Sequence, residues 1–268
     1  GSHDTMTYCL DKRSVNGNES KLLKYLNKWL PCIVRPIIMK WSTTQELTVT
    51  EQLEAGVRYL DFRIAHKAND PSVNLYFVHM FYTTVTVQDT LWQILRWLET
   101  HPREVVILAC RNFDGLTKKL HHHLVARIKE VFQSKLCPRY VSMRSFFPPF
   151  FKNNILRILL IPRGARSGVN AMLSSFCSPQ RNTSCHLLIF VSGKFFVAGI
   201  NLTENLIYIL GHPFGSLKKI TLQSLPCLKI WIKQQHPGSQ KDCINIIAGD
   251  FIGNDDFVKY VIELNEKI

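Results

Sequence analysis

The feature that most constrains the fold is a continuous apolar run at residues 105–110, Val-Val-Ile-Leu-Ala-Cys. A strand buried on both faces, as in a parallel sheet, is apolar throughout, whereas a half-exposed strand alternates. Residues 87–99 before this run repeat apolar side chains at helical spacing, and residues 116–132 after it do the same. A buried strand between two amphipathic helices predicts a parallel sheet covered by helices.

Other segments extend this alternation of strands and helices. Further strands are predicted at residues 59–64, 75–78 and 244–248, and further helices at residues 19–30, 50–55 and 255–264. Pro31 and Gly56 are expected to end the helices before them. The 268 residues, 46% of them hydrophobic, suffice for one α/β barrel of roughly 250 residues, so we predict a single domain over residues 1–268.

The middle of the chain has a different composition. Residues 131–203 contain nine Lys and Arg but no Asp or Glu, and strand-like character is limited to residues 156–161. One interpretation is a basic membrane-contacting loop, because residues 146–151 read Phe-Phe-Pro-Pro-Phe-Phe. The other is a segment foreign to the fold, such as an altered splice product. The abrupt change favours the second for much of it, so we predict a divergent basic segment at residues 139–194.

Charge and cysteine usage bear on partners and location. The formal net charge of +13 indicates anionic partners such as phosphate, acidic lipid or nucleic acid, although a solvated basic surface explains the charge alone. The eight cysteines show no Cys-x-x-Cys spacing, which argues against a zinc ribbon and indicates a reducing compartment. Cys110 is expected to be a small buried hydrophobe. With no signal-peptide pattern and no membrane-spanning run, we predict a cytoplasmic protein, with peripheral membrane contact left open.

Polar side chains with catalytic potential stand at the beginning of the chain or follow strand-like runs. They are His3, Asp4, Asp61, Arg63, His79, Arg111 and Asp250. In a parallel barrel, groups at the carboxyl ends of strands gather at one mouth. Two imidazoles, an arginine and carboxylates at one mouth provide what in-line cleavage of a phosphodiester needs: a base, an acid and a stabiliser of negative charge.

Each of these residues, taken alone, has a simpler explanation. His79 fits a structural histidine, Asp61 and Arg63 fit an ordinary salt bridge, and Asp250 fits a loop cap. The three histidines at residues 121–123 are adjacent on a predicted helix, so they point in different directions and are expected to face solvent. Only the set as a whole favours catalysis.

The motifs around this set resemble a known family. Residues 101–113, 195–205 and 245–253 are similar to the X catalytic domain of phosphatidylinositol-specific phospholipase C, in the small single-domain vertebrate type called X-domain-containing proteins. The resemblance covers residues 1–138 and 195–268. It implies a distorted TIM-like (β/α) barrel.

The resemblance also implies roles for the residues. His3 is the general base that takes a proton from the inositol 2-hydroxyl, and His79 protonates the departing diacylglycerol oxygen. Asp4 pairs with His79 and Arg63, Asp250 orients His3, and Arg63 neutralises charge on the phosphoryl oxygens.

Two more residues, Arg111 and Asp61, are assigned to substrate binding by the same resemblance. Calcium-dependent signalling members of the family have an asparagine after the first histidine and a carboxylate in place of Arg63. This chain has Asp4 and Arg63, as in the bacterial secreted enzymes. The resemblance therefore implies chemistry without calcium, metal or cofactor.

Two departures from the family pattern predict an incomplete barrel. No apolar strand precedes Gly1, so His3 is expected to lack its scaffold. Residues 139–194 offer no carboxylate to bind inositol hydroxyls. About 1 Å of misplacement costs on the order of a hundredfold in rate, so weak or absent activity in this isoform is part of the prediction.

The sequence thus predicts a phosphoric diester hydrolase of the phospholipase C X type, acting on a phosphoinositide or related anionic lipid. The alternative from another class is a non-catalytic barrel that binds anionic lipid. A nucleic-acid role rests on charge alone. A glycerophosphodiesterase is a further enzyme alternative, but its carboxylate cluster for metal is not visible in the sequence.

Overall fold

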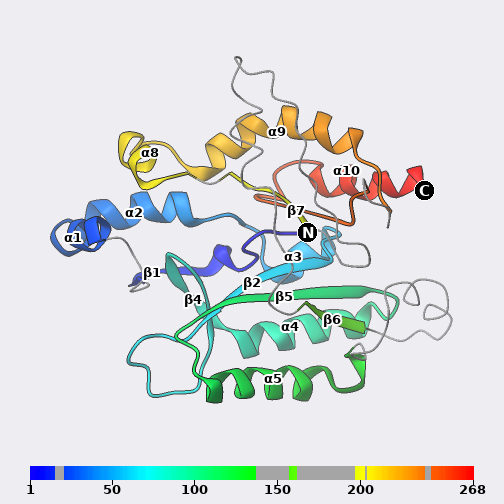
Figure 1. The fold of residues 1–268 in the computed structure, drawn as a ribbon, viewed down its shortest axis with the longest axis horizontal. Helices are drawn as coiled ribbons and strands as arrows, with labels where there is room; N and C mark the ends of the chain where they lie inside the picture. The colour runs from blue at the N-terminus through cyan, green and yellow to red at the C-terminus, as the bar shows by residue number, and fades with distance from the viewer. Residues whose placement is uncertain (16–20, 137–156, 162–196, 203, 239–242) are drawn as a thin grey trace.

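The computed structural model describes residues 1–15, 21–136, 157–161, 197–202, 204–238 and 243–268 (Figure 1). The strands are β1 (Leu10–Val15), β2 (Tyr59–Ala65), β3 (Tyr76–His79), β4 (Phe81–Thr86), β5 (Val105–Asp114), β6 (Arg157–Ile161), β7 (Val197–Ile200) and β8 (Ile246–Gly249). The helices are α1 (Lys21–Trp29), α2 (Pro31–Ser42), α3 (Val49–Glu54), α4 (Val87–Thr100), α5 (Lys118–Phe132), α8 (Leu206–Gly211), α9 (Leu217–Gln234) and α10 (Phe257–Glu263).

The strands form two sheets. One has six strands in the order β1-β4-β3-β2-β5-β6, in which β2, β5 and β6 are parallel and the β1-β4-β3-β2 pairings are antiparallel. The other pairs β7 with β8 in parallel. Ser2 connects the two sheets through single bridges to Leu60 of β2 and Gly249 of β8. The predicted α/β class is therefore confirmed, but within the described residues no pairing joins β6 to β7 and closes a barrel.

Helices lie on two sides of the central strands. In Figure 1, α4 and α5 lie on one side of β2 and β5, and α2, α9 and α10 lie on the other. Local signals explain where α4 and α5 begin, because the side chains of Thr86 and Thr117 accept hydrogen bonds from backbone amides in the first turns. No helix in the described part of the chain is long and apolar enough to cross a membrane.

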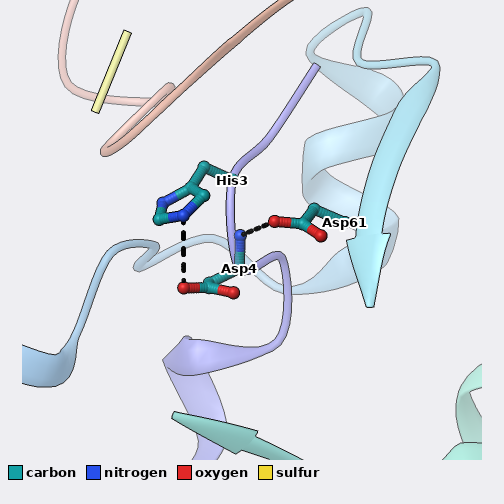
Figure 2. Close-up of side chains that lie close together, drawn as sticks. All are labelled: His3, Asp4 and Asp61. Atoms are coloured by element: carbon teal, nitrogen blue, oxygen red, sulfur yellow. Dashed lines mark hydrogen bonds and ion pairs between the residues drawn. The ribbon is translucent and has the colours of Figure 1, made fainter. Parts of the chain in front are cut away.

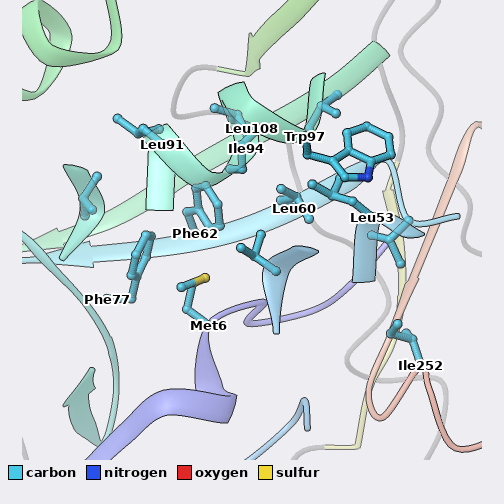
Figure 3. Packing of buried hydrophobic residues seen from close by; sticks show 14 of the residues in the cluster. Met6, Leu53, Leu60, Phe62, Phe77, Leu91, Ile94, Trp97, Leu108 and Ile252 are labelled. Carbon is cyan, nitrogen blue, oxygen red and sulfur yellow. The ribbon is translucent and has the colours of Figure 1, made fainter. Parts of the chain in front are cut away.

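The main core lies between β2 and the helices α3 and α4. Leu60, Phe62 and Ile64 of β2 are fully buried. The Phe62 ring packs against Phe77, with 4.8 Å between ring centroids, and Figure 3 shows both rings near Met6. Asp61 and Arg63 alternate with these apolar residues along β2, so their side chains point to the other face of the strand.

The predicted elements were found where periodicity was strong. The strands at residues 59–64, 105–110 and 156–161 and the helix at residues 87–99 correspond to β2, β5, β6 and α4. The expectation that Pro31 only stops a helix is incomplete, because Pro31 is also the first residue of α2, where its missing N–H is harmless. Apart from β6, the segment at residues 139–194 lies outside the described residues.

Candidate active site

The first three residues lie between β2 and β8. The Ser2 amide donates to the Tyr59 carbonyl at 3.0 Å, and the His3 amide donates to the Gly249 carbonyl at 3.0 Å. The Gly1 amino group adds a 2.7 Å hydrogen bond to a carbonyl of β8. The expectation that His3 lacks a scaffold is therefore wrong, because neighbouring strands on both sides hold its backbone.

The ring of His3 is fixed at both nitrogens. Its Nδ1 lies 2.8 Å from Oδ1 of Asp250, and its Nε2 lies 2.9 Å from Nη2 of Arg63 and 3.4 Å from Oδ2 of Asp4. In the neutral ring, the carboxylate accepts from Nδ1 and the guanidinium donates to Nε2. This geometry favours the tautomer with its proton on Nδ1, which leaves Nε2 as the basic nitrogen.

Asp4 is the centre of the site (Figure 2). Its Oδ2 lies 3.4 Å from Nε2 of His3 and 3.6 Å from Nε2 of His79. Its other carboxylate oxygen contacts Nε of Arg63, and its backbone amide donates to Oδ2 of Asp61 at 3.1 Å. The two imidazoles therefore meet around one carboxylate oxygen.

His79 ends β3, and its ring also reaches Asp4. Its Nδ1 donates to the Ser42 carbonyl, 2.7 Å away, at the end of α2. This bond fixes the ring so that Nε2 points to Asp4. His79 thus has a local partner for one nitrogen, as a structural histidine does, and its second nitrogen lies within the site.

The two arginines pair with different carboxylates. Nε of Arg111 lies 2.5 Å from Asp61 and its Nη2 contacts the same carboxylate, which gives a two-pronged ion pair. Arg63 instead contacts Asp4. The simple explanation of Asp61 and Arg63 as partners of each other is therefore wrong. Each guanidinium balances a buried carboxylate and still retains partial exposure to solvent.

Burial and nearby charges shift the pKa values of the two imidazoles in opposite directions. Burial disfavours a charged His3, but the carboxylates of Asp4 and Asp250 outweigh it and raise the pKa of His3 to about 9. Burial lowers the pKa of His79, and the positive Arg63 and His3 lower it further against the attraction of Asp4. The proton therefore resides on His3 rather than on His79 in the unliganded protein at neutral pH.

The two buried aspartates also differ. Burial raises the pKa of Asp250 by more than its partner His3 lowers it. Burial likewise works against a charged Asp4, but His3, His79, Arg63 and Arg111 outweigh it and lower the pKa of Asp4. Asp4 is thus the carboxylate that stays charged among these cations.

The donor atoms of His3, Asp4 and Asp61 lie within 4.8 Å of one another, close enough to be tested as a metal site. Both carboxylates already face guanidinium groups, from Arg63 and Arg111. A divalent cation at this position would be repelled by two fixed positive charges. The donor set therefore fits a calcium ion poorly.

The backbone around the site is strained. Asp4, Met80, Asn112 and Phe251 have φ values of 42°, 63°, 69° and 51°, in the left-handed region that non-glycine residues rarely adopt. Each is a site residue or directly follows one. Such conformations persist only where surrounding contacts enforce them, and they concentrate at functional sites.

Two expectations away from the site need correction. Among the three histidines of α5, only His122 is exposed, and the His121 ring packs edge-on against Phe113 at 4.9 Å. Cys110 is half-buried against the core rather than fully buried, and burial raises the pKa of its thiol to about 12.

The sequence interpretation missed Thr44 and Gln45, which follow α2. Both side chains are completely buried and both contact the carbonyl of His3. No periodicity or spacing distinguishes them, because they belong to a short polar connection. Only their burial in the structure marks them as important, because a buried amide must find hydrogen-bond partners.

Similar proteins show the family to which this chain belongs. Residues 37–131 match the family PI-PLC X 1. PI-PLC X domain-containing protein 1 of Homo sapiens is 52% identical over 285 residues, which cover 100% of this chain and 86% of the relative. The chain belongs to the PI-PLC X domain-containing protein family. PI-PLC X domain-containing protein 2 of Mus musculus, another member, is 32% identical, over 99% of this chain and 81% of its own length.

Solved structures extend the likeness to the fold. The phosphatidylinositol-specific phospholipase C of S. aureus superposes with a TM-score of 0.63 at 15% identity, over 98% of this chain and 90% of that one. The enzyme of the same type from Listeria monocytogenes gives a TM-score of 0.58 at 14% identity, over 100% and 91%. The PI-PLC X chain therefore has the α/β fold of these TIM-like barrel enzymes.

Proposed function

We propose that this PI-PLC X chain is a phosphoric diester hydrolase that cleaves a phosphoinositide-type phosphodiester by acid–base catalysis. The observation that carries the proposal is the convergence of two imidazoles: Nε2 of His3 and Nε2 of His79 both lie within 3.6 Å of Oδ2 of Asp4. Two proton-transfer groups close to one another suit a reaction in which one oxygen loses a proton and another gains one.

The reaction follows from these positions. Nε2 of His3 takes the proton of the inositol hydroxyl next to the phosphate, and that oxygen attacks phosphorus. The bond from phosphorus to the diacylglycerol oxygen breaks, and His79 supplies the proton to the departing oxygen. The products are a cyclic inositol phosphate and diacylglycerol, and Arg63 and Arg111 balance the charge on the phosphoryl oxygens.

The reacting protonation state is the reverse of the resting one. Catalysis needs a neutral His3 and a protonated His79, whereas the surrounding charges raise the pKa of His3 and lower that of His79. Only a minor fraction of the unliganded protein then carries the productive proton arrangement. This fits an enzyme of low turnover.

Calcium has no role in the proposed reaction. Arg63 and Arg111 already supply positive charge at the carboxylates of Asp4 and Asp61. Turnover is therefore expected to be equal in excess chelator and in millimolar calcium. A steep calcium requirement in a diesterase assay would exclude this assignment.

The proposed partner is an anionic lipid surface. An apolar face, formed by Tyr25, Trp29, Leu30 and Ile33, is exposed on α1 and the start of α2, and Lys28 lies beside it. Exposed apolar side chains gathered with a lysine suit the boundary of a lipid layer. Trp29→Ala is expected to weaken sedimentation with vesicles that contain phosphatidylinositol. Trp92→Ala on α4 is the control, and equal loss in both variants would exclude this face.

The proposal is tested by assaying cyclic inositol phosphate from phosphatidylinositol vesicles. His3→Ala and His79→Ala are each expected to lower turnover by about 10²- to 10⁴-fold. His122→Ala on the exposed side of α5 is the matched control and should leave turnover unchanged. Vesicle binding without product in the unaltered chain would instead support the non-catalytic lipid-binding barrel.

A further inference from the structure

A short segment, residues 42–45, begins with the last residue of α2 and contacts both halves of the proposed catalytic pair. The Ser42 carbonyl accepts from Nδ1 of His79 at 2.7 Å. The Thr44 hydroxyl lies 3.1 Å from the His3 carbonyl, and Nε2 of Gln45 donates to the same carbonyl at 2.9 Å. We call these four residues the strap. One short segment thus fixes groups that come from the beginning of the chain and from β3.

Gln45 makes the central link of the strap. Its side chain is 0% exposed, and its amide nitrogen donates to the carbonyls of His3 and Gly249, both at 2.9 Å. Its amide oxygen accepts from the Ile252 backbone at 3.4 Å. Gly249 immediately precedes Asp250. One amide group therefore ties together the two backbone segments that carry His3 and Asp250.

Thr44 reinforces the same junction. Its carbonyl accepts from the Phe251 amide at 2.6 Å, and its hydroxyl lies 2.8 Å from the hydroxyl of Thr7. Phe251 has a φ of 51° and directly follows Asp250. A phenylalanine rarely adopts this left-handed backbone conformation, so the contacts around Phe251 must hold it there. The strap therefore supports the backbone on which the Asp250 carboxylate stands.

His3 and Asp250 are 247 positions apart in the chain, and a single 2.8 Å contact joins their side chains. One backbone hydrogen bond, from the His3 amide to the Gly249 carbonyl, joins their segments directly, and Gln45 donates to the carbonyls of both residues that this bond joins. A shift of either backbone by about 1 Å would break the side-chain contact, and misplacement of this size costs on the order of a hundredfold in rate. A buried, hydrogen-bonded amide resists such shifts, because each broken hydrogen bond would leave a buried polar group without a partner.

We propose that Gln45 is a positioning residue, which holds the His3 and Asp250 backbones at the separation their side chains require. Thr44 supports the same junction, and the Ser42 carbonyl orients His79. The catalytic consequence rests on the proposed function. The positioning of the pair is a separate claim that can be measured without turnover.

A second buried glutamine provides a matched control. Gln52 of α3 is also 0% exposed, and its amide nitrogen donates to the carbonyls of Thr5 at 2.9 Å and Leu47 at 2.8 Å. Gln52→Met and Gln45→Met remove the same number of donors from equally buried positions. They are expected to lower the melting temperature similarly. Only Gln45→Met removes a bond to His3.

The experiment measures two properties of this chain. The first is the NMR resonance of the Nδ1 proton of His3, which a hydrogen bond to Asp250 moves far downfield. The second is kcat and KM on phosphatidylinositol vesicles. Gln45→Met is expected to shift or broaden the resonance and to lower kcat by at least about tenfold, with KM within about twofold. Gln52→Met is expected to retain both the resonance and kcat.

Several outcomes decide the proposal. A resonance that is unchanged in Gln45→Met, or lost equally in Gln52→Met, overturns it. If Gln45→Met does not fold, Thr44→Val and Thr44→Ser replace it. Loss of the resonance in Thr44→Val, with retention in Thr44→Ser, supports the strap, and its retention in both overturns it. If the unaltered chain lacks turnover, the proposed function fails, and the resonance alone still decides whether Gln45 positions the pair.

Discussion

The two faces of β2 differ in what makes them stable. On one face Leu60, Phe62 and Ile64 are fully buried among other apolar side chains, where contact is non-directional. On the other face Asp61 and Arg63 reach the site, where each needs a particular partner of opposite charge. One strand thus supplies stability on one side and the proposed chemistry on the other. Substitutions on the two faces should have separable effects.

The largest effect is expected on the apolar face. Phe62→Ala should lower the free energy of unfolding by about 3–5 kcal/mol, because it removes a fully buried ring from a packed core. Urea denaturation measures the loss. The folded fraction should keep its kcat, and Phe214→Ala, at a ring that is 97% exposed, should change the unfolding free energy little. A lower kcat in folded Phe62→Ala would show that the two faces are not independent.

The polar face should give the converse result. Arg63→Lys keeps the charge but loses the planar group that contacts Asp4 and His3 together. Turnover is expected to fall by about 10²- to 10³-fold with little change in urea denaturation. Arg58→Lys, at the Glu104 ion pair away from the site, is the control. A large loss of stability in Arg63→Lys with unchanged kcat would assign Arg63 a structural role only.

A subtler comparison is the dependence of kcat/KM on pH. The productive form needs neutral His3, whose pKa is about 9, and protonated His79, whose pKa is lowered below its ordinary value. The rate should rise about tenfold per pH unit on the acid side until His79 titrates. It should then stay flat until about pH 9 and fall above that pH. A narrow maximum that ends near the ordinary histidine pKa would show that the carboxylates do not hold a proton on His3.

The elements that sequence periodicity predicted are those with a strong apolar pattern. The run at residues 105–110 and the spacing at residues 87–99 correspond to β5 and α4. β1 escaped detection because it contains Asp11, Lys12 and Arg13, as an edge strand can. The 18-residue helix α9 was also missed, and it contains Pro226. In both cases, tertiary packing outweighs the local pattern.

The sequence by itself determined which side chains are available for the chemistry: two histidines, two arginines and three carboxylates at chain positions that β2, β3, β5 and β8 bring together. The family resemblance already implied the pairing of Arg63 with Asp4, whereas only the tertiary structure decided the pairing of Arg111 with Asp61 and the strap behind His3 and Asp250. The physical reason is that periodicity records which face of an element is buried. Ion pairs and buried amides depend instead on ångström distances between segments that are remote in sequence.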